Sequence, residues 1–490
     1  MFFAEAKGCP YAMLAGMNLK GFIPLLLLFF APFFVNAGSE PDELVITHVT
    51  VIDATGAASQ DDMTVVIKGN RIAAIKKSAP AETEKEARVV DASGKYLIPG
   101  LWDMHVHLFN HVNPGPPGEY YFPLLIANGV TSVRDMWTKL DDVEQVQKWR
   151  KQFSEGATIP RIVLAGTLID GANPVWPEAD TVAIADDARK MVDKVKAGGA
   201  DFVKVYWNLS REEYFAIADE CRKQGIPFAG HVPFSVSAAE ASDSGQRSIE
   251  HLTEISFTCS AKEKEFRKVD PKKWGPKYEM EVLRSFDQKK CEGLFSRFVK
   301  NRTWQVPTLV IYHKLILKEA ELLSDDRLKY IPASKREEWK SFFDLMKNRT
   351  PEQADYGNRL WQTNLNLVGA MRRAGVEFMA GTDMGIAVSY IYAGFSLHDE
   401  LALLVQAGFT PMEALQAGTR NASRFAEKLD SIGTIEQGKI ADLVLLDANP
   451  LENITNTQKI DAVILDGKLI SKESLQQMLA EVEASARGGR

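Results

Sequence analysis

The sequence contains few cysteines. Four occur in 490 residues, and Cys9 lies within the N-terminal segment that we interpret below as a signal peptide. Cys221, Cys259 and Cys291 remain, and this odd, sparse set does not form a disulfide framework. Their spacing also excludes a zinc site built from paired thiolates. We expect either core thiols or one incidental bridge.

The chain also lacks an excess of positive charge. Its formal net charge is −7 and its isoelectric point is about 5.8, which argues against a surface for nucleic acids or anionic membranes. Hydrophobic residues make up 45% and charged residues 25% of the chain, as in an ordinary globular protein. A chain of 490 residues can bury a large core and form more than one domain.

Motifs of several enzyme classes are absent. The sequence contains no Gly-x-Ser-x-Gly, no P-loop and no His-Glu-x-x-His. It therefore lacks the serine-nucleophile turn, the phosphate-binding loop and the helical zinc site that these motifs supply. Internal repeats and low-complexity tracts are not visible either.

Residues 1–37 have the pattern of a secretory signal peptide. Lys20 precedes an apolar stretch at residues 21–35, and a small-x-small ending follows. The alternative is a transmembrane anchor, but the stretch is short for a bilayer that needs about 20 apolar residues, and it contains two prolines. We expect cleavage and a secreted or periplasmic protein with no stable membrane insertion. Residues 1–16 look like an upstream start, with Met17 as the initiator.

Short strands are expected near both ends of the mature chain. Two of the first strands flank Gly69-Asn70, a typical hairpin turn. Runs of the same kind recur far downstream. We predict that segments 38–98 and 431–475 pair into one small composite β-sandwich domain, and that residues 476–490 form a C-terminal helix or tail.

The centre alternates predicted strands with predicted helices, the pattern of a parallel α/β fold. Eight strands are the number of a (β/α)₈ barrel of the TIM type, which we predict for residues 99–430. Helices are expected at 211–224 and 411–427, and a charged helical insertion at about 260–365. The predicted strands are the one before His105 and those at 131–134, 161–164, 202–206, 228–231, 248–251, 308–310 and 377–380.

His105 and His107 are the most informative residues. They end an alternating apolar stretch that begins at Leu97. Residues i and i+2 of a strand point to the same face, so both imidazoles leave the strand end together, with the spacing that binds one divalent metal. A pair of surface histidines on an edge strand is the structural alternative.

Four further polar residues fall at or near the ends of predicted strands: Lys204, His231, His251 and Asp383. Alone, each has an ordinary explanation, such as a core histidine, a turn aspartate or a lysine that reaches the surface. In a parallel barrel, however, the carboxyl ends of the strands converge on the catalytic face. We therefore expect these four side chains to meet the histidine pair at one site.

With these residues the chain resembles the metal-dependent amidohydrolase superfamily. The matching pattern is Gly-Leu-x-Asp-x-His-x-His, which ends at His107, followed by the strand lysine, two single strand-end histidines and the late aspartate. Residues 129–136, 408–415 and 433–444 look like its imidazolonepropionase-like and Xaa-Pro-dipeptidase-like branch. The resemblance covers about residues 43–475.

The resemblance implies a (β/α)₈ barrel with a composite β domain and two divalent metal ions, with zinc as the first choice for imidazole and oxygen ligands. A hydroxide that bridges the metals would attack the substrate carbonyl, and Asp383, as the catalytic residue, would move the proton to the leaving nitrogen. The analogy assigns six metal ligands: His105, His107 and Asp383 for the more buried ion, His231 and His251 for the other, and Lys204, as a carbamate, for both.

The reaction implied is hydrolysis of a C–N amide bond in a peptide-like or N-acyl amino acid substrate. Hydrolysis of lactones or other esters stays open, because the same hydroxide can attack them. Deamination with one metal is a further alternative. Deaminases of this superfamily usually carry a glutamate shortly after the position of His231, but this chain has Val232-Pro233-Phe234-Ser235 there. A non-catalytic metal-binding protein is the alternative from another class.

Three residues are weaker candidates for substrate binding: Tyr206, Arg134 and His111. The structural alternatives are a buried ion pair between Arg134 and Asp135, and a solvated loop position for His111. We expect a small-molecule or peptide-like substrate as the partner and no nucleic acid. The sequence leaves open whether the chain forms a homo-oligomer.

Overall fold

The computed structural model describes residues 43–79, 87–111, 117–269, 275–347, 349–385 and 390–488. The predicted signal peptide at residues 1–37 lies outside this part of the chain. Within the described ranges, no helix combines the length and the apolar character needed to cross a bilayer.

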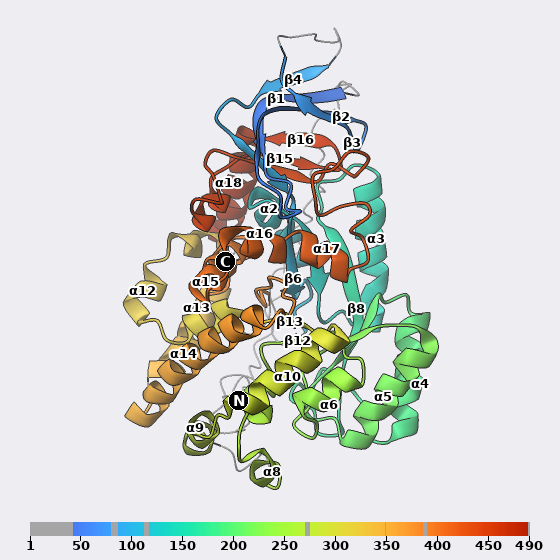
Figure 1. The fold of residues 1–490 in the computed structure, drawn as a ribbon, viewed down its shortest axis with the longest axis vertical. Helices are drawn as coiled ribbons and strands as arrows, with labels where there is room; N and C mark the ends of the chain where they lie inside the picture. Colours follow the sequence, from blue (N-terminus) through green and yellow to red (C-terminus); the bar gives the residue numbers. More distant parts are fainter. Residues whose placement is uncertain are drawn as a thin grey trace.

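Eight strands from both ends of the described chain form one mixed sheet: β1 (Glu43–Val51), β2 (Gln60–Lys68), β3 (Arg71–Lys77), β4 (Arg88–Asp91), β5 (Tyr96–Pro99), β14 (Leu443–Leu446), β15 (Ile460–Leu465) and β16 (Lys468–Ser471). Its order is β16-β15-β14-β5-β1-β2-β3, with β4 beside β1 (Figure 1). Because β5 pairs with both β1 and β14, the two groups of strands share a single sheet. The two ends of the chain therefore build one domain, as the sequence predicts.

Seven parallel strands form most of the barrel: β6 (Leu101–Val106), β7 (Val130–Asp135), β8 (Arg161–Asp170), β10 (Phe202–Val205), β11 (Phe228–Gly230), β12 (Ser248–Glu250) and β13 (Trp304–Val306). The short β9 (Asp180–Thr181) pairs with the end of β8. Since neighbours pair in parallel, all carboxyl ends lie at one edge.

An irregular segment fills the eighth position of the barrel. Phe378, in the last predicted strand, forms a parallel bridge with Gln305 of β13. Met384, which follows that strand, forms a parallel bridge with Val106 of β6. Backbone hydrogen bonds on both sides close the ring. Regular pairing ends here because Asp383 has a left-handed backbone, with φ of 64°.

One strand prediction was wrong. The strand expected at 308–310 lies earlier, as β13, and Thr308 leads instead into helix α11 (Leu309–Lys314) with a left-handed φ of 46°. A run of three apolar or β-branched residues does not distinguish a strand from the first turn of a buried helix.

Helices surround the barrel. The helix predicted at 211–224 is α5, which begins with a capping box between Ser210 and Glu213. The helix predicted at 411–427 is divided, because Thr419 leaves the helical conformation. The elements are α2 (Phe122–Ala127), α3 (Val143–Ser154), α4 (Ala185–Ala197), α5 (Arg211–Gln224), α6 (Ala238–Asp243), α15 (Phe395–Gln406), α16 (Pro411–Ala417), α17 (Arg420–Phe425) and α18 (Lys472–Gly488).

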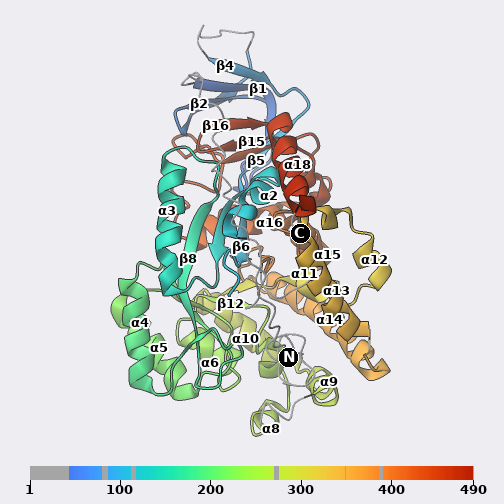
Figure 2. The same cartoon turned by 180° about the vertical axis from the view of Figure 1, so that it is seen from behind.

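The predicted helical insertion is present and holds β13 within it. Its helices are α7 (Ile255–Thr258), α8 (Glu263–Phe266), α9 (Pro276–Arg284), α10 (Gln288–Asn301), α11, α12 (Glu319–Leu323), α13 (Ala333–Lys347) and α14 (Pro351–Arg373). Figure 2 shows α13 and α14 on the side of the molecule opposite α4 and α5. A disulfide between Cys259 and Cys291 joins the end of α7 to α10, and Cys221 is a buried thiol.

Candidate active site

The six predicted ligand residues lie at the carboxyl ends of the barrel strands, and all of them line one pocket. Most of their surface is buried, and the pocket that they line is partly open to solvent. In chain order they are His105 on β6, His107 just after it, Lys204 on β10, His231 after β11, His251 after β12 and Asp383 after the eighth segment.

Both histidines of the pair face the same carboxylate oxygen of Asp383. Oδ1 of Asp383 lies 3.1 Å from Nε2 of His105 and 2.9 Å from Nε2 of His107. On its other side, Nδ1 of His105 lies 2.8 Å from Oε2 of Glu250. A carboxylate on the far nitrogen fixes the ring and its tautomer, as in many metal sites.

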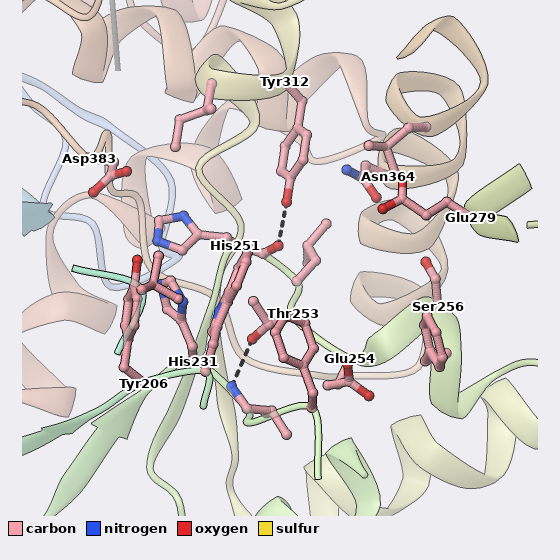
Figure 3. A pocket seen from close by; sticks show the side chains of 18 of the residues that line it. Tyr206, His231, His251, Thr253, Glu254, Ser256, Glu279, Tyr312, Asn364 and Asp383 are labelled. Carbon is pink, nitrogen blue, oxygen red and sulfur yellow. Dashed lines mark hydrogen bonds between the residues drawn. The ribbon is translucent and has the colours of Figure 1, made fainter. Parts of the chain in front are cut away.

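His251 approaches the same group from the end of β12. Its ring centre lies 4.5 Å from that of His105. It also lies 4.8 Å from that of His231, and Figure 3 shows these two rings beside each other. Nδ1 of His251 lies 2.7 Å from the hydroxyl oxygen of Thr308. Ligand-type atoms of His105, His251 and Asp383 all lie within 4.8 Å of one another. His251 and Asp383 both have a positive φ, a strained conformation that is common at functional sites.

Unsatisfied nitrogen atoms make this cluster suitable for metal ions. Nδ1 of His107 and Nδ1 of His231 are buried, and the described chain offers neither of them a hydrogen-bond partner. Leaving buried polar atoms without a partner is costly, so such atoms indicate a ligand. Imidazole nitrogens with a carboxylate suit zinc and related divalent metals. The donor set therefore fits the metal ions that the sequence resemblance implies.

Lys204 is 1% exposed and faces the same cluster. Burial lowers the pKa of its amine to about 8, partly offset by the nearby carboxylates of Glu250 and Asp383. Gly230 permits this packing, because a Cβ atom there would lie 2.3 Å from the carbonyl oxygen of Val205 and 3.0 Å from Cδ of Lys204. A lysine in this place fits a carbamate, which forms from the neutral amine.

Burial and the charges at the site favour neutral forms of His231 and His251 and an ionised Asp383. Burial and then the charge of His105 lower the pKa of His251 to about 3, and burial with Lys204 lowers that of His231 well below its usual value. Burial alone would raise the pKa of Asp383, but His105 and His251 hold it well below the usual range. Neutral imidazole and carboxylate are the forms that bind metals.

Three supporting residues were missed by the sequence reasoning. Glu250 holds His105, Thr308 holds His251, and Asp103 accepts hydrogen bonds from the backbone N–H (3.0 Å) and hydroxyl (2.6 Å) of Thr382, next to Asp383. Their places in the sequence could have indicated two of these three residues. Asp103 belongs to the Gly-Leu-x-Asp-x-His-x-His pattern, and Glu250 directly precedes a predicted ligand.

Tyr206 is the weaker substrate candidate that lines the pocket. Its ring centre lies 4.2 Å from that of His231. Arg134 and His111 are not among the described residues that line the pocket. His111 stacks on Phe109 and lies 3.3 Å from a carboxylate oxygen of Asp142.

The suggested ion pair of Arg134 with Asp135 needs correction. Arg134 is fully buried and donates to both carboxylate oxygens of Glu250, at 2.9 Å each. Asp135 instead accepts hydrogen bonds from the backbone of Leu108 and from the hydroxyl of Thr138. Adjacent residues of a strand point to opposite faces, which is why the two do not pair.

The outer part of the pocket comes largely from the helical insertion. Tyr312 on α11 donates a hydrogen bond of 2.6 Å to the carbonyl oxygen of His251, and so fixes the insertion to the barrel (Figure 3). Aromatic residues dominate the inner wall beside the histidines. The lining residues of both walls include Trp176, Tyr206, Trp207, Phe234, Glu279, Val282, Tyr356 and Asn364.

Sequence comparison finds one matching family. The amidohydrolase family profile matches residues 96–265 and 349–470. An imidazolonepropionase of Haloarcula marismortui is 32% identical over 117 residues, which are 23% of this chain and 27% of that protein. An adenine deaminase of Chelativorans sp. is 27% identical over 206 residues, 40% of this chain and 33% of that protein. The matched segments thus span about a third or less of these curated relatives.

Similar folds occur among solved structures. A bottromycin amidohydrolase has a TM-score of 0.72 and 23% identity, with 91% of each chain covered. An Xaa-Pro dipeptidase with bound methionine in its active site has a TM-score of 0.63 and 21% identity, covering 88% of this chain and all of that one. At these identities the likeness establishes the barrel with its added β domain.

Proposed function

The chain belongs to the amidohydrolase family, and from this premise we propose that it is a metal-dependent hydrolase that cleaves a C–N amide bond in peptide-like or N-acyl amino acid substrates. One observation carries the proposal. Four histidines, a buried lysine and an aspartate from five strand positions of the barrel line the same pocket at the catalytic face.

The proposed centre holds two divalent ions, with zinc as the first choice. When bound, the ions would acidify a water molecule and polarise the substrate carbonyl. His105, His107 and Asp383 would hold the first ion, and His231 and His251 would hold the second. Lys204, modified to a carbamate, would serve as a ligand of both.

The protein's own groups then have distinct tasks. Asp383, kept ionised by its histidine neighbours, accepts a proton from the nucleophilic water and passes it to the leaving nitrogen. Glu250 orients His105 by binding its far nitrogen. Tyr206 and Trp207 pack against His231 and exclude bulk water from that side.

Amide hydrolysis has some support from the structural comparison, since the similar folds include an enzyme described as an Xaa-Pro dipeptidase. Deamination is a second candidate, because adenine deaminases occur among the sequence relatives. Against it, Val232 and Pro233 follow His231 where a deaminase of this superfamily usually has a nearby glutamate. Lactones and other esters remain substrates that the same centre could attack.

The test is metal analysis and a substrate panel on the purified mature chain. The panel contains dipeptides, N-acyl amino acids, adenine and lactones. Two metal ions per chain with turnover of amides would support the proposal. Turnover of adenine or lactones alone would replace it with one of the alternatives, and two bound metals without any turnover would indicate a non-catalytic metal-binding protein.

We also propose a secreted or periplasmic location. The disulfide between Cys259 and Cys291 supports it, because such bonds persist in oxidising compartments and are rare in the cytosol. Sequencing the N-terminus of the protein recovered from its producing cells tests the proposal. A mature N-terminus near residue 38 is expected, and an intact leader on a cytosolic protein would contradict it.

A further inference from the structure

The pocket extends from the candidate metal centre toward the helical insertion. Asn364 on α14 lines this outer part, and Figure 3 shows it on the side opposite Asp383. In the same view, the nitrogen of its carboxamide lies on the side that faces Tyr312. A substrate whose amide lies at the metal centre therefore has Asn364 facing its other end.

Asn364 keeps an unused hydrogen-bond donor in this buried place. The residue is 2% exposed, and its Nδ2 atom has no hydrogen-bond partner in the described chain. Buried polar atoms in native proteins are nearly always satisfied, because leaving one without a partner is costly. A bound molecule that supplies an acceptor would satisfy this atom.

The chemistry of that acceptor follows from the groups around the pocket. An ammonium group only donates hydrogen bonds, so it does not satisfy Nδ2 of Asn364. A carboxylate accepts them, but Lys204 is the only lysine or arginine among the described residues that line the pocket, and it lies at the metal end. Burying a charge without a partner is expensive. A neutral acceptor remains, and a carbonyl oxygen is the one that peptide-like substrates carry.

The walls beside Asn364 are apolar. Leu360 precedes it by one helical turn and so lies on the same face of α14. Val282 and Leu283 belong to α9, which packs against α14. All three aliphatic side chains line the pocket, and such walls favour methylene or ring groups of a substrate.

We propose that Asn364 and the aliphatic side chains beside it form a subsite for a neutral, apolar group of the substrate that carries a carbonyl oxygen. Nδ2 of Asn364 donates a hydrogen bond to that oxygen, and the aliphatic side chains cover the carbon chain between it and the scissile amide. The inference rests on the proposed amide hydrolysis and names the substrate class. The remote end of the substrate is an uncharged acyl or capped-peptide group, not a free amino or carboxyl terminus.

The experiment compares two matched series of acyl prolines on the metal-loaded enzyme. In one series a ketone carbonyl near the end of the acyl chain lies at increasing distance from the amide, and in the other a methylene group replaces that carbonyl. The readout is the ratio of kcat/KM for the ketone and the methylene member of each pair. We expect this ratio to peak at one chain length in the wild type. Asn364→Asp, whose carboxylate cannot donate, should lower the peak about five-fold or more.

Two further variants make the test specific. Asn364→Leu removes the donor without adding a charge and should lower the ratio by a similar factor. Asn358→Asp is the matched control, because Asn358 lies on the same helix, is exposed and does not line the pocket; it should leave the ratio at the wild-type value. Because the ratio compares two substrates on one protein sample, a general loss of folded enzyme does not change it.

The methylene series alone tests the aliphatic walls. Its kcat/KM should rise about three- to four-fold with each added methylene group until the chain fills the subsite. Leu360→Ala removes part of the wall and should flatten this rise. Values that do not depend on chain length in the wild type would contradict the apolar part of the subsite.

Titration calorimetry with the same compounds separates the possible failures. If no acyl proline is hydrolysed, but a ketone member binds more tightly and loses this advantage in Asn364→Asp, the subsite stands and the proposed reaction on these amides fails. If the prolines are hydrolysed and the ratio peaks at no chain length, or if both Asn364 variants keep the wild-type ratio, the subsite is wrong.

Discussion

Single side chains at the candidate centre are held by partners that are distant in the sequence. Arg134 donates to Glu250, 116 residues away, and Glu250 in turn holds His105. The sequence predicts the residues that enter the site, because each lies at or just after the end of a predicted strand. It does not predict these supporting contacts, because they depend on the register and tilt of strands that only the folded barrel sets.

Lys204→Ala should remove most of the activity, by about a hundred-fold or more, because the proposed bridge between the two ions is lost. Short carboxylic acids added to the assay should restore part of it by replacing the carbamate. The exposed Lys151 provides a control, and Lys151→Ala should retain wild-type rates. Steady-state kinetics with and without acetate or propionate measures the effect. Wild-type rates for Lys204→Ala without an additive would contradict the assignment.

Glu250→Gln should both destabilise the protein and weaken metal binding. Arg134 would keep its charge in a fully buried place without a carboxylate, which costs about 3–5 kcal/mol in comparable cases. Metal affinity should fall about 10–100-fold because His105 loses its orienting partner. Urea unfolding and competition with a chelator measure the two effects. Glu427→Gln, which removes an exposed partner of Arg247, is the control and should change neither.

Helices and strands followed the sequence where local signals were strong. Helix α5 has the predicted bounds because Ser210 and Glu213 cap its start and a left-handed glycine ends it. The strand prediction failed at Thr308 before α11, where the backbone turns without a glycine. Left-handed non-glycine residues are uncommon, so no local sequence pattern predicts them. Tertiary contacts have to stabilise this conformation.

The contact between α15 and the start of α11 should depend on pH. Glu400 accepts hydrogen bonds from the backbone N–H groups of Leu309 and Val310, and burial raises its pKa to about 8. Since the unfolded chain loses this proton near the ordinary glutamate value, the stabilisation is complete below that value and is lost as the pH rises through 8. Relative to Glu400→Gln, the wild type should lose up to about 1.4 kcal/mol per pH unit in this window.

Urea unfolding at several pH values measures this difference. Each wild-type free energy of unfolding is compared with that of Glu400→Gln at the same pH, which removes the contribution of all other groups. A constant difference between the two proteins from about pH 5 to about pH 9 would show that Glu400 does not titrate as stated.

The bridge between α7 and α10 should contribute to stability. Cys259 and Cys291 are separated by 32 residues, and closing a loop of this size corresponds to about 3–4 kcal/mol in the chain-entropy model. The double variant Cys259→Ala with Cys291→Ala should lose roughly this amount in thermal or urea unfolding. A reducing agent should lower the stability of the wild type but not that of the double variant. Equal stability of the two proteins under oxidising conditions would refute the contribution.

In the whole molecule, the terminal strands and the barrel form one connected structure. The pairing of β5 with β14 brings residues from both ends of the chain into one sheet, and β5 leads directly into the strand that carries His105. This organisation was predictable, since the composition of the two ends and the alternating centre are visible in the sequence. The outer wall of the pocket was not, because Glu279 and Asn364 come to line the same pocket only through the packing of α9 against α14.

Anomalous diffraction from crystals of the metal-loaded protein tests the central claim most directly. The account predicts two peaks between His105, His107, His231, His251 and Asp383, with Lys204 between them and ligand distances of about 2.0–2.2 Å. Peaks elsewhere in the protein, or none at this cluster in protein that is hydrolytically active, would contradict it.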